Sequence, residues 1–174
     1  EDQRVLRAVQ IVVDEGLAKP VLIGRTAVIE DNIKKLGLRL QHGVNIEIVD
    51  QENNPLYDDF WKDYHQTMQR KGVTVEYAQR EARRRSTLIA ALLVKFGKAD
   101  GMLCGTYSSY DIHLDFVKNV IGLKEGRSTL FTLNALMLED RNLFIADTYV
   151  NTNPTAEQLA EMTILAAEEV RRFG

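Results

Sequence analysis

The sequence has little cysteine, little proline and no excess of basic residues. One cysteine in 174 residues excludes an internal disulfide framework and a structural zinc site built on several cysteines, and it suits the reducing cytoplasm. The formal net charge of −3 gives no general attraction to nucleic acid, for which a basic face would be expected. Three prolines and eleven glycines argue against long disordered stretches. We therefore expect a folded, soluble cytoplasmic protein that binds no nucleic acid.

Long apolar runs are also absent. No run reaches the roughly 18–20 residues that a membrane helix needs, and residues 1–4 are unlike a signal peptide. His42, His65 and His113 are scattered without ligand spacing, so we expect no metal site. No repeat with a period of about 20–50 residues is visible. A chain of 174 residues, of which 45% are hydrophobic, can bury one good-sized core or two small ones.

Apolar residues at helical spacing predict a series of helices. Thr74 is a predicted N-cap, Ser86 or Thr87 is predicted to cap the next helix, and Asn153 followed by Pro154 is predicted to open the last one. The predicted helices cover residues 5–13, 26–36, 56–70, 75–85, 88–96, 111–120 and 154–173.

Short apolar runs between these helices predict buried strands at 21–23, 46–49 and 102–104. Residues 130–138 and 143–146 predict a hairpin. Helices that alternate with short buried strands indicate an α/β fold, a three-layer α/β/α sandwich with a mainly parallel sheet. The chain opens and closes with a helix, so we expect an upstream strand and a downstream continuation, with residues 1–174 forming one incomplete domain.

The segment 101–111 is the most suggestive of a ligand site. A predicted strand ends here, a hydroxyl-rich turn follows, and a helix begins. Ligands of open α/β sheets bind beyond the carboxyl ends of strands, and a helix N-terminus suits a phosphate or carboxylate. The alternative is that Ser108 or Ser109 only caps the helix. The candidate ligand-binding residues are those of the turn: Gly105, Thr106, Tyr107, Ser108 and Ser109.

Other features point to chemistry less strongly. The sequence has neither a Gly-rich dinucleotide fingerprint nor a phosphate-binding loop ending in Gly-Lys-Ser/Thr. Cys104 could be a nucleophile, but we expect a buried structural thiol. His113 and Asp111 lie two residues apart and share no helix face, so a general-base role is disfavoured. Four arginines could contact ligand phosphates or an acidic partner, or could form a solvated helix end: Arg80, Arg83, Arg84 and Arg85.

A series of short segments, in order along nearly the whole chain, resembles one enzyme family. The segments are 4–8, 16–24, 36–38, 47–50, 70–72, 97–102, 104–105, 144–147, 150–151 and 154–161. Together they resemble the phosphate acetyltransferase (phosphotransacetylase) family, which usually has Ser-Gly where this chain has Cys104-Gly105. The resemblance implies a fold of two α/β domains with coenzyme A in the cleft between them, of which this chain matches the first part.

One departure from that family bears on activity. In active members an Arg-Pro pair stands in the helix after the Ser-Gly element, and its arginine helps bind phosphate and the developing charge of acyl transfer. Aligned on Asp111, the pair falls at Leu114-Asp115. Leucine cannot stabilise an oxyanion, and aspartate would repel phosphate. The resemblance therefore implies no catalytic residue in this chain.

Several segments are closer to a subgroup of the family. Arg25, 104–106, 117–120 and 147–151 resemble the phosphotransacetylase-like C-terminal domain of bacterial NADP-dependent malic enzymes. This resemblance implies a regulatory domain that binds acetyl-CoA or a related acyl-CoA and tunes the oxidation of malate to pyruvate and CO2. The malic enzyme module of the same chain would use NADP and a divalent metal, and this domain would bind no cofactor. It also implies a homo-oligomer.

Two further hypotheses stay open. The chain could be a fragment of an active phosphate acetyltransferase, which converts acetyl-CoA and phosphate to acetyl phosphate and CoA, or a purely structural oligomerisation domain. Leu114 argues against the transferase, and a test of ligand binding separates the regulatory domain from the structural one.

Overall fold

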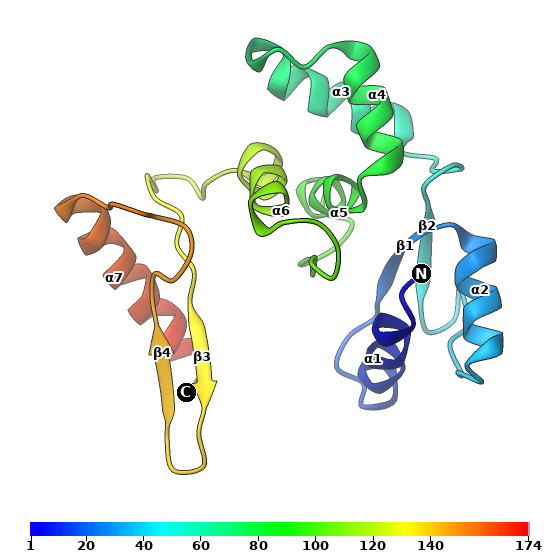
Figure 1. Ribbon diagram of the computed structural model, residues 1–174, viewed down its shortest axis with the longest axis horizontal. Helices are drawn as coiled ribbons and strands as arrows, with labels where there is room; N and C mark the ends of the chain where they lie inside the picture. Colours follow the sequence, from blue (N-terminus) through cyan, green and yellow to red (C-terminus); the bar gives the residue numbers. More distant parts are fainter. Residues whose placement is uncertain (174) are drawn as a thin grey trace. The chain divides into compact units, whose positions relative to one another are not determined.

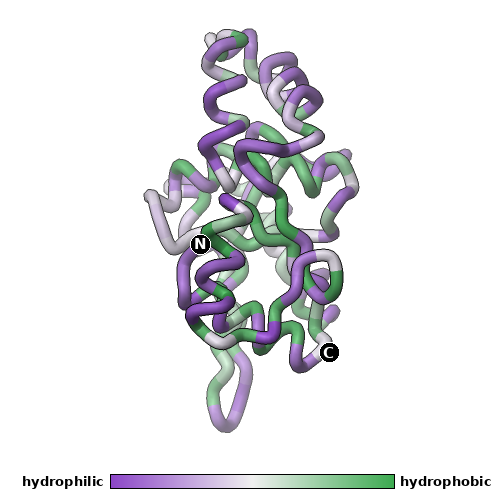
Figure 2. The backbone as a smooth tube through the Cα atoms, turned by 90° about the vertical axis from the view of Figure 1, so that its right-hand side faces the viewer, coloured by the Kyte–Doolittle hydropathy of each residue, from purple (hydrophilic) through white to green (hydrophobic). Residues whose placement is uncertain are grey.

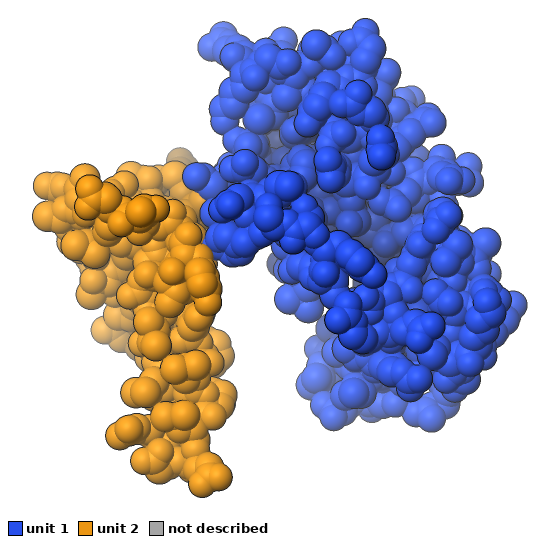
Figure 3. Space-filling view, viewed as in Figure 1, with its two compact units in different colours: residues 1–122 blue, residues 123–174 orange. Residues whose placement is uncertain are grey.

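The computed structural model describes residues 1–173, which divide into two compact units. Unit 1 comprises Glu1–Gly122 and unit 2 comprises Leu123–Gly174, described as far as Phe173 (Figure 3). No helix within the described residues is long and apolar enough to cross a membrane.

Unit 1 contains the helices that the apolar spacing predicts, with ends that shift by a few residues (Figure 1). Gly16 and Gly97 end their helices in left-handed conformations, with φ of 64° at both. Residues 117–121 continue the last helix with π-type hydrogen bonds. The elements are α1 Gln3–Asp14, β1 Val21–Gly24, α2 Thr26–Lys35, β2 Glu47–Asp50, α3 Tyr57–Met68, η1 Gln69–Lys71, α4 Val75–Arg84, α5 Ser86–Lys95, α6 Tyr110–Phe116 and η2 Val117–Ile121.

The sheet of unit 1 separates two hydrophobic clusters. β1 and β2 pair in parallel, and their side chains alternate between the faces, as the period of a strand requires. Leu22 and Ile48 pack against the cluster formed with α1 and α2, whereas Val21, Ile23 and Val49 pack against the cluster formed with α3 and α5. Helices therefore cover both faces, and the predicted α/β/α layering is confirmed in this unit.

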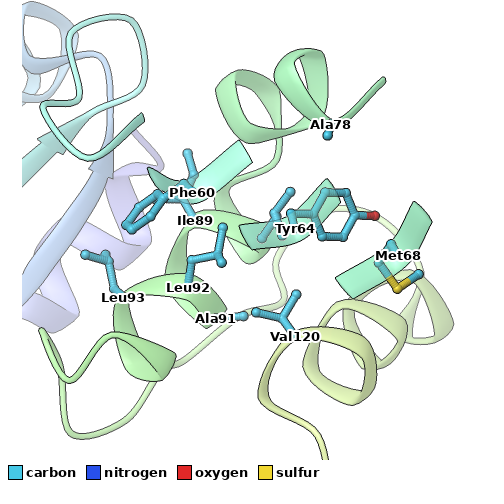
Figure 4. Close-up of a cluster of buried hydrophobic side chains, with 10 residues drawn as sticks. Phe60, Tyr64, Met68, Ala78, Ile89, Ala91, Leu92, Leu93 and Val120 are labelled. Atoms are coloured by element: carbon cyan, nitrogen blue, oxygen red, sulfur yellow. The ribbon is translucent and has the colours of Figure 1, made fainter. Parts of the chain in front are cut away.

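Helix α5 forms the centre of the larger cluster. Its residues from Thr87 to Leu93 are all buried, as expected for a helix that is apolar on every side. Phe60 of α3 is fully buried in this cluster (Figure 4). Its ring meets that of Phe96 edge to face, with 5.5 Å between ring centroids. The buried members of the cluster are Phe60, Tyr64, Met68, Ala78, Leu88, Ile89, Ala91, Leu92, Leu93 and Val120.

The predicted strand at 102–104 is wrong. Residues 101–105 form no strand, and Leu103 is completely exposed, at 101% of its reference area. An apolar run becomes a strand only where a neighbouring strand supplies partners for its backbone N–H and C=O groups. In the described residues of unit 1, β1 and β2 pair only with each other, and no third strand joins them.

Unit 2 contains the predicted hairpin and the last helix. β3 (Asn134–Met137) pairs antiparallel with β4 (Asn142–Ile145), which confirms the hairpin in shorter form. The hydrophilic tip between them is the loop at the bottom of Figure 2. Helix α7 spans Ala156–Arg172.

Two predicted N-caps are wrong. The last helix is capped by Thr155, whose hydroxyl accepts from the Gln158 N–H in a capping box, and not by Asn153. Helix α5 has Arg85 at its N-cap position and no side-chain cap. The Thr87 hydroxyl is hydrogen-bonded to His113 instead, so it is not available as a cap.

Candidate functional site

The candidate turn at Gly105–Ser109 has an irregular backbone. Gly105, Thr106 and Ser108 have φ values of 143°, 56° and 75°, and the Tyr107 N–H donates to the Gly105 carbonyl at 2.5 Å. Positive φ is unfavourable for residues with a Cβ, most of all for a β-branched residue such as Thr106. All five residues of the turn are exposed. The five residues predicted to bind a ligand therefore form one contiguous surface turn with an uncommon backbone conformation.

A histidine ties this turn to the core of unit 1. His113 Nε2 lies 2.6 Å from the carbonyl oxygen of Tyr107, and its Nδ1 lies 2.7 Å from the hydroxyl of Thr87. A carbonyl oxygen only accepts, so Nε2 carries the proton, and in the neutral ring Nδ1 accepts from the Thr87 hydroxyl. From the sequence, His113 is considered only as a general base beside Asp111, and its contact with the turn is not predicted. No spacing signal could have revealed it, because Thr87 lies 26 residues away.

The local setting of the turn differs from the expected one. The turn does not follow a strand, and α6 begins at Tyr110 with Ser109 at its N-cap position but without a side-chain cap bond. The alternative of a serine side-chain cap is therefore not realised. Neither Ser108 nor Ser109 has a side-chain hydrogen bond to another described residue, and both residues are exposed. Asp111 in the first turn adds a negative charge beside them.

A hollow of about 510 Å³ is lined by residues of α3, α4, α6 and η2. We call it the α6 hollow. Burial raises the pKa of Tyr64 to about 12, and its hydroxyl has no hydrogen bond to a described residue. The hollow is lined by Tyr64, Met68, Lys71, Gly72, Val73, Tyr77, Glu81, Arg85, Ile112, Asp115, Phe116 and Asn119.

The charges that line the α6 hollow balance one another. Lys71 donates to the Asn119 side-chain oxygen at 2.7 Å, and Arg85 Nε donates to the Glu81 carboxylate at 2.8 Å. Asp115 adds a second carboxylate. Two cations therefore face two carboxylates, which provides no net attraction for a phosphate.

The four arginines in and directly after α4 do not form one site. All are exposed, and only Arg85 lines the α6 hollow. Arg80 lies over the ring of Tyr77 at 4.9 Å and Arg83 over that of Tyr57 at 4.3 Å. They contact separate neighbours at a helix end, where positive charge complements the helix dipole.

Cys104 is exposed, so the expectation of a buried structural thiol is wrong. The physical reason is that its segment joins no sheet. Partial burial of the sulfur still raises the pKa of the thiol, which disfavours the nucleophilic thiolate.

A second hollow, of about 460 Å³, lies at the carboxyl ends of β1 and β2 and includes Asp50. The Asp50 carboxylate accepts from the backbone N–H groups of Thr26, Glu52 and Asn53, and these hydrogen bonds lower its pKa to about 2. Its acceptor capacity is used by its own loop and by the first residue of α2, so it supports the backbone around the end of β2.

Comparisons with known proteins place this geometry in a family. The sequence profile described as phosphate acetyl/butaryl transferase matches residues 1–174. The chain belongs to this family. A phosphotransacetylase from Streptococcus pyogenes, of known structure, superimposes with a TM-score of 0.83 at 26% identity, over 94% of this chain and 49% of that chain. This likeness confirms the α/β fold.

Relatives within this transferase family divide into two kinds. An NADP-dependent malic enzyme from Haemophilus influenzae is 51% identical over 100% of this chain. A phosphate acetyltransferase from Nitratidesulfovibrio vulgaris is 33% identical over 99% of it. The chain spans 23% and 24% of the lengths of these two relatives. It thus corresponds to a transferase-like part of longer enzymes and is more similar to the malic enzyme.

Proposed function

We propose that this chain is the regulatory, acetyl-CoA-sensing domain of an NADP-dependent malic enzyme and does not itself transfer acetyl groups. The observation that carries the proposal is Asp115 in the α6 hollow, next to Leu114, where the family resemblance places an Arg-Pro pair. Leucine at this position supplies no positive charge for phosphate or for the oxyanion of acyl transfer, and the two cations of the hollow, Lys71 and Arg85, are hydrogen-bonded to Asn119 and Glu81. The higher identity to malic enzymes supports the same reading.

The longer protein of which this chain would be one domain is proposed to oxidise malate to pyruvate and CO2 with NADP and a divalent metal. Among residues 1–173, no three side chains of the types His, Cys, Asp and Glu come together as a metal site. On the strength of the family resemblance, we propose that the malic enzyme module of the same chain binds the metal and NADP. We further propose that the enzyme is a cytoplasmic homo-oligomer, on the strength of the family resemblance.

Acetyl-CoA, or a related acyl-CoA, is proposed to contact the Gly105–Ser109 turn. The support is the exposure of the turn and the two serine hydroxyls that are not used by other described side chains. An effector bound there would act through a coupling free energy, typically about 1–3 kcal/mol, which corresponds to roughly a 5- to 150-fold change in affinity.

Replacing Ser108 and Ser109 together by alanine in the longer enzyme should weaken the response to acetyl-CoA. Loss of two hydrogen bonds worth about 0.5–1.5 kcal/mol each would raise the half-effective acetyl-CoA concentration by roughly 5- to 150-fold. The measurement is malate oxidation against acetyl-CoA concentration, with Ser86→Ala as the control. If basal activity and response fall together, the turn is only structural. If neither changes, the effector binds elsewhere and the site assignment fails.

The longer protein should form no acetyl phosphate from acetyl-CoA and phosphate. The reason is Leu114-Asp115 in place of the pair whose arginine binds phosphate in the resembled family. A coupled assay, run beside an active phosphate acetyltransferase, tests this expectation. Turnover within the usual enzyme range of about 1–1,000 per second would instead favour the alternative of an active transferase.

A further inference from the structure

We propose that His113 is a positioning residue that holds the Gly105–Ser109 turn in its ligand-ready shape by linking it to the buried helix α5. The imidazole donates from Nε2 to the Tyr107 carbonyl and is oriented by the Thr87 hydroxyl at Nδ1. The inference deepens the proposed function, because it assigns control of the effector turn to a residue outside the turn.

The anchor of this link is rigid. Thr87 is only 6% exposed and lies in the buried part of helix α5, where its neighbours Leu88 and Ile89 are fully buried. Side chains in such a close-packed core have little freedom to move. A hydroxyl fixed there sets the orientation of the imidazole ring, and the ring in turn sets the position of the Tyr107 carbonyl.

The turn needs such a constraint. Thr106 and Ser108, on either side of Tyr107, both have positive φ. Left-handed backbone conformations of residues other than glycine cost about 1–2 kcal/mol each and persist where surrounding contacts enforce them. The hydrogen bond from His113 is made to the carbonyl of Tyr107, which lies between these two residues. Its removal should let the turn relax, so that the Ser108 and Ser109 hydroxyls leave the arrangement that is proposed to contact acetyl-CoA.

The test uses the longer enzyme and three variants. His113→Phe removes both hydrogen bonds, His113→Gln keeps an N–H donor near the position of Nε2, and Thr87→Val removes the orienting hydroxyl while keeping the size of the buried side chain. One readout is backbone hydrogen exchange of residues 105–110 without acetyl-CoA. The other is the half-effective acetyl-CoA concentration, compared with the KM and kcat of malate oxidation.

His113→Phe should speed exchange in the turn by tenfold or more and raise the half-effective concentration at least fivefold, and His113→Gln should restore most of both. Thr87→Val should move both readouts in the same direction, which keeps the test valid if His113→Phe fails to fold. Unchanged exchange in His113→Phe and Thr87→Val, or equal impairment of the Gln and Phe variants, would overturn the positioning role. If the wild-type enzyme does not respond to acetyl-CoA, the proposed function fails, and exchange alone decides the role of His113.

Discussion

Replacing Phe60 with alanine is expected to lower the free energy of unfolding of unit 1 by about 3–5 kcal/mol, the usual cost of removing a buried aromatic ring. Phe60 has no exposed area and lies in the cluster around α5, where its ring meets that of Phe96. Its removal loses the transfer free energy of the ring and leaves a cavity that close-packed neighbours fill only in part.

Denaturant unfolding followed by the fluorescence of Trp61, the single tryptophan of the chain, measures this loss. Leu103→Ala is the matched control, because Leu103 is fully exposed and its truncation should change the free energy of unfolding by no more than about 0.5 kcal/mol. A loss below about 1 kcal/mol for Phe60→Ala would show that α3 does not pack on α5 as described.

Replacing Asp147 with alanine is expected to destabilise unit 2 by about 2–4 kcal/mol, because several donors lose their acceptor at once. The carboxylate accepts from the backbone N–H and hydroxyl of Thr132 at 3.0 and 2.9 Å, and from the backbone N–H and side-chain amide of Asn151 at 2.8 and 2.6 Å. These bonds join the segment before β3 to the segment before α7. Asp147→Asn keeps one acceptor oxygen and should cost less.

The same carboxylate predicts a dependence of stability on pH. Burial alone would raise the pKa of Asp147, but the hydrogen bonds from Thr132 and Asn151 lower it from 3.8 to about 2. Because the pKa is lower in the folded state, this stability is fully present above about pH 4 and is lost as the pH falls through about 2. Allowing for partial solvent exposure, the contribution is about 1–2 kcal/mol.

Chemical unfolding monitored by circular dichroism at pH 6 and pH 3 tests this dependence. Asp50 also has a pKa lowered to about 2, so the informative quantity is the difference between the wild type and Asp147→Asn. The difference should be larger at pH 6 than at pH 3. An equal difference at both values would mean that Asp147 is not held as a carboxylate by these donors.

Local patterns were sufficient where neighbours in sequence decide the structure. The apolar stripe that includes Leu6 and Val9 predicts α1, because this helix buries one face. The apolar residues around Ile48 predict β2, whose side chains alternate between the two hydrophobic clusters. The apolar run at 102–104 has the same local character but forms no strand, because pairing requires a neighbour that local sequence does not specify. The cap at Thr155 is a different case, because its capping box with Gln158 is a local motif that the prediction of Asn153 overlooked.

Residue identity and spacing alone predict the α/β class, the order of the helices, the hairpin, the family, and the absence of the Arg-Pro pair at Leu114-Asp115. These follow from periodicity and residue identity, which are local properties. Only the tertiary structure decided that Asp115 faces a hollow with balanced charges, and that His113 joins Thr87 to Tyr107. The physical reason is that a hydrogen bond or a charge in a hollow depends on which side chains folding brings within a few ångströms, whatever their separation along the chain.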